Sequence, residues 1–198
     1  MLLDHYSAVL IAFHSSQSSW NGDARLLSNR LSTLLNTIRI FKQDIYAQYS
    51  SKPHFIIKQL IRSMEEDLNK QKINVELLFD LPEGEAALIS QNDLTAIMEN
   101  CIRNASRALT NQKRKILRIR LFELAPRVRI QIMDAGSGIG EDIAEKIFEP
   151  GWSGSGGSGL GLFQAREILK KYAATISLDP PHDQGLTTFT IDLHKGVR

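Results

Sequence analysis

The sequence predicts an α+β fold in which an N-terminal helical hairpin precedes a sandwich of one sheet and one layer of helices. Two helical apolar patterns joined by a short turn occupy the first 50 residues, and mixed helical and strand patterns fill the rest. Several strand patterns follow one another directly instead of alternating with helices. Strands of this kind form hairpins within a mixed sheet, so we expect the helices on one face of it.

Composition and charge restrict the class of protein. The chain has 198 residues, 42% of them hydrophobic and 23% charged, and its net charge is +2. These values are typical of a globular protein and give no reason to expect contact with nucleic acid or with a membrane surface. The single cysteine, Cys101, excludes an internal disulfide and fits a reducing compartment. No apolar run approaches the ~20 residues of a membrane span, and no signal peptide is recognisable. We therefore expect a cytoplasmic protein, or the cytoplasmic part of a larger membrane-bound one.

The N-terminal region has the pattern of two amphipathic helices. Apolar residues in residues 2–19 recur at spacings of four, three and four, and residues 24–49 carry a nearly heptad stripe that follows Asp23, a suitable N-cap. A hairpin has only two faces to bury, so we expect residues 1–50 to form a four-helix bundle with a second copy. The first helix is the shorter one, which indicates that it begins upstream of Met1.

Pro53 interrupts the helical pattern, so we predict a helical domain at residues 1–52 and a second domain at residues 53–198. In the second domain, helical and period-two apolar patterns predict four helices and five strands, with Pro126 in a hairpin turn. The predicted helices are residues 55–71, 93–109, 141–148 and 160–172, and the predicted strands are residues 74–81, 116–124, 128–133, 175–178 and 187–193.

The predicted helix at residues 93–109 carries an unusual polar stripe. Asn100, Asn104 and Arg107 are spaced i, i+4 and i+7, so they share one face, while the opposite face is apolar. By itself this stripe is equally well explained as a solvated face. The amide oxygen of Asn104 suits Mg²⁺, which is commonly shared with nucleotide phosphates, and Arg107 one turn later suits a phosphate.

Two glycine clusters point to a ligand with phosphates. Residues 134–139 read Asp-Ala-Gly-Ser-Gly-Ile, and residues 157–162 read Gly-Ser-Gly-Leu-Gly-Leu directly before a predicted helix. Consecutive exposed N–H groups and a helix N-terminus both favour phosphate, and the carboxylate of Asp134 can accept a hydrogen bond from an exocyclic amine. Residues 154–159 also match G-x-G-x-x-G, but no buried strand precedes them, and a P-loop is absent. The clusters therefore indicate a nucleotide site of another kind.

Four motifs in order resemble those of a known family. Residues 100–105, 134–138, 147–150 and 157–162 resemble the N, first glycine, F and second glycine boxes of sensor histidine kinases, which belong to the GHKL ATPase superfamily. Each motif alone is weak, but the ordered set is specific and covers roughly residues 55–193. The resemblance implies that the second domain is an α/β sandwich of the GHKL (Bergerat) type.

The resemblance also implies a site for ATP and Mg²⁺. It places Mg²⁺ at Asn104, adenine at Asp134, a water or phosphate contact at Glu99 or Asn100, and a lid at residues 151–156. The lid is short and lacks a basic residue, for which Arg107 could compensate. The full set of expected ATP-binding residues is Asn100, Asn104, Arg107, Asp134, Gly136, Gly138, Ile139, Phe148, Gly157, Ser158, Gly159, Leu160, Gly161, Leu162 and Thr188, with Glu99 and Asn100 as catalytic residues.

In the family, a preceding hairpin dimerises and carries the phosphorylated histidine, and residues 1–50 resemble that hairpin. The implied function is a protein-histidine kinase of a two-component system, which passes its phosphoryl group to the receiver domain of a response regulator. His5 is the candidate acceptor, His14 is a weaker one, and neither has the acidic residue and proline that usually follow. An acceptor upstream of Met1, or a lost acceptor, is the leading alternative.

Other functions stay open at this level. A kinase-like regulatory dimer could bind ATP or a partner without phosphorylating itself. A GHKL protein could also phosphorylate a serine or only hydrolyse ATP, although the long hairpin argues against this. We expect no nucleic-acid partner and no membrane contact in this fragment.

Overall fold

The computed structural model describes residues 24–152, 159–180 and 185–196. The chain divides into two compact units, with the boundary between Gln48 and Tyr49. The predicted first helix, the turn after it and the Asp23 cap lie outside the described residues.

Helix α2, Ala24–Tyr49, has the predicted bounds and nearly all of it belongs to the first unit. Leu31, Leu35 and Ile38 are spaced i, i+4 and i+7, and each exposes about half of its surface or more. Such a stripe on one helix face is typical of a helix that packs against others.

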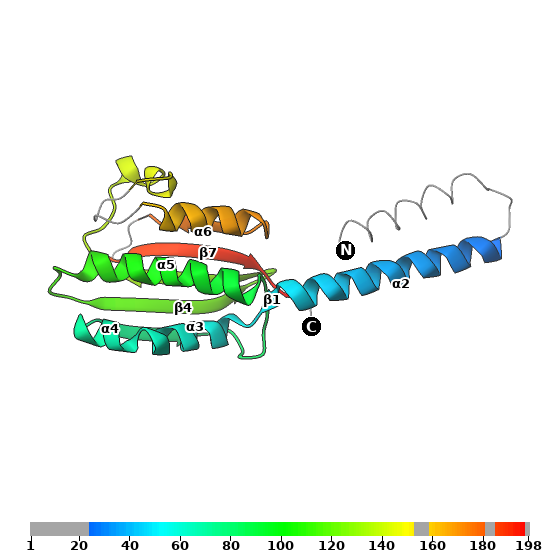
Figure 1. Cartoon of the computed structure of the whole chain (residues 1–198), viewed down its shortest axis with the longest axis horizontal. Helices are drawn as coiled ribbons and strands as arrows, with labels where there is room; N and C mark the ends of the chain where they lie inside the picture. Colours follow the sequence, from blue (N-terminus) through cyan, green and yellow to red (C-terminus); the bar gives the residue numbers. More distant parts are fainter. Residues whose placement is uncertain (1–23, 153–158, 181–184, 197–198) are drawn as a thin grey trace. The chain divides into compact units, whose positions relative to one another are not determined.

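The second unit is built on a five-stranded sheet of the order β2-β4-β5-β7-β6, of which Figure 1 labels β4 and β7. The pair β2–β4 is parallel and the other pairs are antiparallel, so the sheet is mixed, as predicted. The strands are β2 at Asn74–Phe79, β4 at Ile116–Leu124, β5 at Arg127–Asp134, β6 at Thr175–Leu178 and β7 at Thr187–His194.

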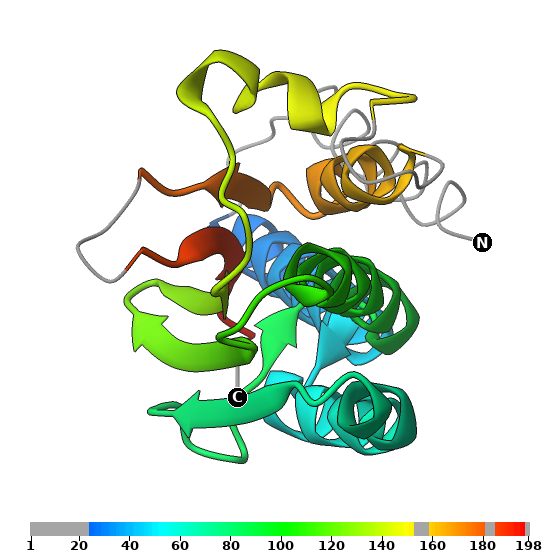
Figure 2. The ribbon, with the colours of Figure 1, turned by 90° about the vertical axis from the view of Figure 1, so that its left-hand side faces the viewer.

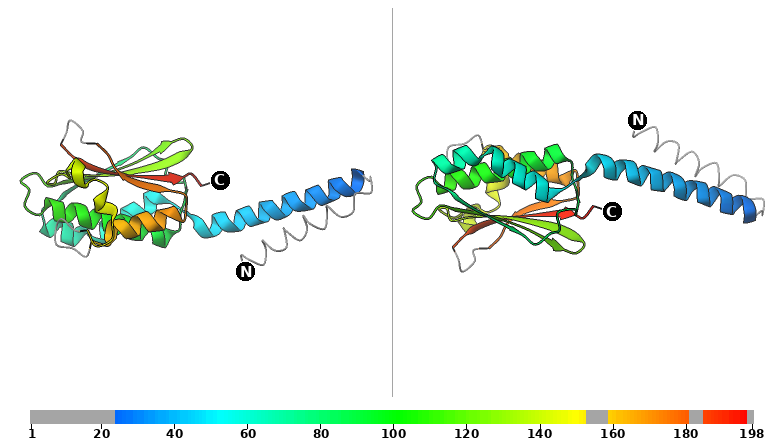
Figure 3. Two further views of the ribbon diagram at one scale, coloured as in Figure 1. Left: turned by 90° about the horizontal axis from the view of Figure 1, so that it is seen from above. Right: turned by 90° about the horizontal axis from the view of Figure 1, so that it is seen from below.

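The helices of this unit cover one face of the sheet, as Figures 2 and 3 show from the end and from above and below. They are α3 at Pro53–Ser63, α4 at Glu65–Lys70, α5 at Gln91–Leu109 and α6 at Gly161–Lys170. The predicted apolar face of α5 is confirmed, since it is buried from Leu94 to Leu109. The helix begins two residues earlier than predicted because the Ser90 hydroxyl accepts a hydrogen bond from the Asp93 N–H at 3.1 Å and caps it.

Three local predictions differ from the structure. The predicted helix at residues 55–71 is two helices, since Met64 leaves helical geometry at φ −98° and ψ 0°. The predicted helix at residues 141–148 is two short 3₁₀ turns, η1 at Glu141–Ile143 and η2 at Lys146–Phe148, a geometry that is frequent in short connecting segments. A two-stranded sheet of β1, Ser50–Ser51, and β3, Ala87–Leu88, was not predicted.

The strand register places polar groups next to the helix layer. In β5 the buried positions alternate, with Val128, Ile130 and Ile132 facing the helices, and Asp134 is the next inward position. Asp134 lies directly opposite Thr187 of β7. A carboxylate therefore stands at the end of a row of core residues. Within the part of the chain that the structure describes, no helix is long and apolar enough to cross a bilayer.

Candidate functional site

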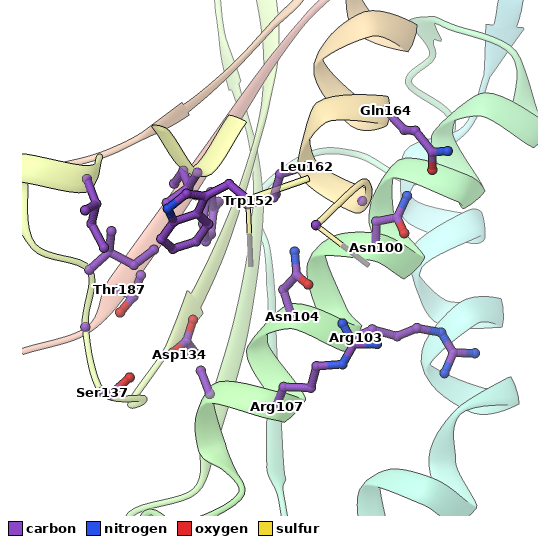
Figure 4. A pocket seen from close by; sticks show the side chains of 18 residues that line it. Asn100, Arg103, Asn104, Arg107, Asp134, Ser137, Trp152, Leu162, Gln164 and Thr187 are labelled. Carbon is purple, nitrogen blue, oxygen red and sulfur yellow. The ribbon is translucent and has the colours of Figure 1, made fainter. Parts of the chain in front are cut away.

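A cavity of about 390 Å³ lies between α5, the C-terminal end of β5, the start of β7 and the start of α6 (Figure 4). Cavities of this size are typical of small-molecule sites. It is lined by Asn100, Arg103, Asn104, Arg107, Ala108, Asp134, Ser137, Gly138, Ile139, Ile143, Ile147, Trp152, Gly159, Gly161, Leu162, Gln164, Thr187 and Phe189. Segments that are far apart in the sequence thus share one cavity.

The polar stripe of α5 forms one wall. Asn100, Asn104 and Arg107 face the cavity together, as their spacing predicts, and Arg103 also lines it. The guanidinium of Arg103 is held by Glu99, since its Nε and Nη2 both donate to Oε1, at 3.0 and 2.7 Å. The wall therefore presents two amides and the Arg107 cation to the cavity, whereas the Arg103 guanidinium is directed away from it toward Glu99 (Figure 4).

Asp134 forms the inner end of the cavity. Only 2% of its surface is exposed, and its Oδ1 accepts a hydrogen bond from the Gly136 N–H at 2.9 Å. Burial raises the pKa of Asp134 to about 6, and the hydrogen bond from Gly136 opposes that rise. A buried carboxylate with a single backbone donor has free capacity to accept a further hydrogen bond, for example from an exocyclic amine of a ligand.

At two positions beside the cavity, neighbouring atoms lie so close to the backbone that only glycine fits. A Cβ on Gly136 would lie 2.5 Å from Oδ1 of Asp134 and 2.7 Å from Cβ of Ala108. Gly159 has a φ of +68°, and a Cβ there would lie 2.4 Å from the carbonyl carbon of Gly151. Any side chain at either position would displace the walls of the cavity.

Most of the predicted site residues that the structure describes line this cavity, and the others lie elsewhere. Nine of them line the cavity: Asn100, Asn104, Arg107, Asp134, Gly138, Ile139, Gly159, Gly161 and Leu162. Glu99, Gly136, Phe148, Leu160 and Thr188 do not line it. His5, His14, Gly157, Ser158 and lid residues 153–156 lie outside the described residues.

Local structure explains why three of the predicted residues lie outside the cavity. Glu99 lines a neighbouring groove between α3 and α5. Phe148 is buried and its ring makes an edge contact with that of Phe189, 6.3 Å between centroids. Side chains alternate along a strand, so Thr188 lies on the face of β7 opposite to that of Thr187. Thr187, and not the predicted Thr188, lines the cavity.

Sequence reasoning missed the lining residues Arg103, Gln164 and Thr187, and it placed Trp152 in the lid without naming it as a binding residue. Helical spacing could have indicated two of them: Arg103 lies one turn before Arg107, and Gln164 lies three residues after the first residue of α6. Trp152 and Thr187 depend on how a loop and a strand pair fold, for which the sequence had no comparable signal.

The donor set fits Mg²⁺ that is shared with a ligand. Among the described residues no group of three or more His, Cys, Asp or Glu could hold a metal ion by itself. Asn104 places an amide in the cavity, one helical turn before Arg107, which suits a phosphate. Mg²⁺ commonly takes one or two protein oxygens and fills its other positions with phosphate oxygens and water, so the residues present suit such an ion.

The residues that line the cavity lie within a stretch that matches a known family. Residues 89–196 match the family described as histidine kinase-, DNA gyrase B-, and HSP90-like ATPase. The chain is 31% identical over 115 residues to the C4-dicarboxylate transport sensor protein DctB of Rhizobium meliloti (strain 1021), which covers 58% of this chain and 18% of DctB. It is 28% identical over 179 residues to the histidine protein kinase SaeS of Staphylococcus aureus (strain USA300), which covers 85% of this chain and 50% of SaeS.

The fold is shared with a solved structure. The catalytic domain of the histidine kinase ThkA superposes with a TM-score of 0.65 at 21% identity, over 73% of this chain and 93% of that domain. At this identity the likeness shows the fold alone, and it confirms the predicted α/β sandwich. The chain spans half or less of the length of DctB and SaeS.

Proposed function

The chain belongs to the family of histidine kinase-, DNA gyrase B- and HSP90-like ATPases, and from this premise we propose that it is the ATP-binding kinase core of a two-component sensor. The observation that carries the proposal is the convergence of three separate stretches. Asn104, Asp134 and Gly159 line the same cavity, although up to 55 residues separate them in the chain. A protein-histidine kinase needs a site of this kind, which holds a base at one end and phosphates at the other.

Each residue has a defined task in this proposal. The carboxylate of Asp134 accepts a hydrogen bond from the exocyclic amine of adenine, since it is buried and has capacity to spare. Arg107 and the start of α6 at Gly161 hold phosphates. The amide oxygen of Asn104 holds Mg²⁺, which when bound neutralises charge on the phosphates.

Phosphoryl transfer then requires an acceptor outside the described residues. The nitrogen of a neutral imidazole attacks the γ-phosphorus in line, an N–P bond forms, and the bond to the bridging oxygen of ADP breaks. Glu99 lies outside the cavity, directly before Asn100 on α5, and its carboxylate, which also holds Arg103, is the group that orients or deprotonates the incoming imidazole in this proposal. The phosphoryl group passes next to an aspartate of a response regulator.

We propose that residues 1–50 dimerise and present this acceptor. The exposed stripe of α2 at Leu31, Leu35 and Ile38 supports the proposal, because a stripe of that kind is stabilised by burial against other helices. His5 is the candidate acceptor within this chain, and an acceptor upstream of Met1 is the alternative. The partner would be a receiver domain, and the setting the cytoplasm, where this core could be part of a larger membrane-bound sensor.

The test is incubation with ATP labelled at the γ-phosphate, followed by acid and alkali treatment. We expect label that is stable in alkali and lost in acid, as for a phosphohistidine, and mass spectrometry of the full chain and of an upstream-extended chain locates it. Asn104→Ala should remove the label, whereas Lys70→Ala, which changes an exposed residue on α4, should keep it. Acid-stable label would indicate a serine kinase, and ADP binding without any label would indicate a regulatory dimer.

A further inference from the structure

Trp152 stands out among the lining residues because it is a large aromatic group that the sequence placed only in the lid, without a binding role. Among the lining residues that the structure describes, only Trp152 and Phe189 are aromatic. Phe189 is 5% exposed and its ring is engaged by Phe148. Trp152 is half-buried, so part of its indole is supported by the apolar core and part is open to the cavity.

Two hydrogen bonds hold the backbone at Trp152 and at the residue before it. The Gly151 N–H donates to the Gly159 carbonyl at 3.1 Å, and the Trp152 N–H donates to the Glu149 carbonyl at 3.4 Å. Gly159 also lies close to this segment, since a Cβ added to it would be 2.6 Å from the Trp152 carbonyl oxygen. These contacts anchor the backbone that carries the indole.

The position of the indole in the cavity indicates which part of a ligand it meets. In Figure 4 it projects into the cavity on the side of Asp134 and Thr187, whereas Asn100 and Gln164 lie on the far side. Asp134 is the group suited to the edge of a base, because it is a buried acceptor. On α5 the lining residue nearest the end of the helix is Ala108, whose methyl group leaves room for a planar ring.

We propose that Trp152 is the stacking wall of the base subsite, so that Asp134 recognises the edge of a purine and Trp152 holds its face. This inference rests on the proposed function, since it assumes that the cavity binds an adenine nucleotide. Indole has a large π-face. Stacking of a base on an aromatic side chain is strong and depends little on which base it is. Trp152 therefore contributes affinity for any purine, while Asp134 contributes the preference for an exocyclic amine.

The experiment measures binding of ADP and of inorganic tripolyphosphate, which has no base, to the full chain and to two variants. Trp152→Leu keeps an apolar side chain but removes the π-face, and Trp152→Phe keeps a smaller π-face. We expect Trp152→Leu to weaken ADP binding roughly 10-fold or more and to change tripolyphosphate binding by less than about twofold. Trp152→Phe should recover most of the lost ADP affinity, and far-UV circular dichroism checks that both variants fold.

A second readout uses the fluorescence of the indole. Trp20 is the only other tryptophan in the chain, so Trp20→Phe leaves Trp152 as the single reporter. Saturation with ADP should quench that emission, and tripolyphosphate should not.

Equal ADP affinity in Trp152→Leu and the unchanged chain would overturn the inference, and so would an equal loss for ADP and tripolyphosphate. If the unchanged chain failed to bind ADP at all, the proposed function would be refuted instead.

Discussion

Replacing Asp134 with Asn should make the free protein more stable while it removes nucleotide binding. The carboxylate is 2% exposed and its pKa is raised to about 6 by burial, so at neutral pH the folded state holds a charge at a cost. Asn has nearly the same shape, is neutral at every pH, and its oxygen can still accept the hydrogen bond from Gly136.

The magnitude follows from the linkage between pKa and folding. A raised pKa favours the protonated folded state, so the contribution of Asp134 to stability is fully present below its ordinary pKa of 3.8 and is lost as pH rises through about 6. With these two pKa values, the loss amounts to about 1 kcal/mol at about pH 4.5 and reaches about 3 kcal/mol at about pH 7.5, above both of them. The gain from Asp134→Asn should therefore grow by about 2 kcal/mol between these pH values.

The assay is urea unfolding of both chains at several pH values, with the difference taken at each so that other titrating groups cancel. Asp67→Asn, which changes an exposed aspartate in the first turn of α4, is the matched control and should show no such gain. Excess ADP should raise the melting temperature of the unchanged chain but not that of Asp134→Asn. A stability difference that does not vary with pH, or a variant less stable than the unchanged chain at about pH 7.5, would refute the reasoning.

Three further predictions follow from the site and the core. Asn104→Ala should abolish the increase in ADP affinity that Mg²⁺ produces and leave affinity in chelator almost unchanged, as calorimetry with and without Mg²⁺ can show; equal Mg²⁺ enhancement in both chains would contradict the metal role. Gly159→Ala should cost more than about 2 kcal/mol of unfolding free energy, because it combines a left-handed φ with a close approach to Gly151, whereas Gly84→Ala, with nothing within 4 Å, should change far less. Cys101 is buried and its pKa is raised to about 12, so it should react with a thiol reagent only after urea unfolds the protein, and rapid labelling of the folded chain would contradict its burial.

Local sequence patterns were sufficient to predict several elements of this protein and one wall of its cavity. The bounds of α2, β4 and β6 agree with their predictions, and the apolar face of α5 is buried as its spacing indicates. These features depend on period and on turn residues, which are properties of short stretches of chain. The spacing of Asn100, Asn104 and Arg107 likewise placed three side chains on one helix face before any tertiary contact was considered.

Only the tertiary structure decided how those stretches meet. Strand register buries Asp134, which raises its pKa, and it places Thr187 instead of Thr188 in the cavity. The position of Trp152 in the cavity depends on a loop that packs against another segment. Register and burial arise from contacts between residues far apart in the chain, so no local pattern encodes them. The sequence by itself thus determined which chemical groups are available, and the packing of α5 against the sheet decided which of them face one ligand.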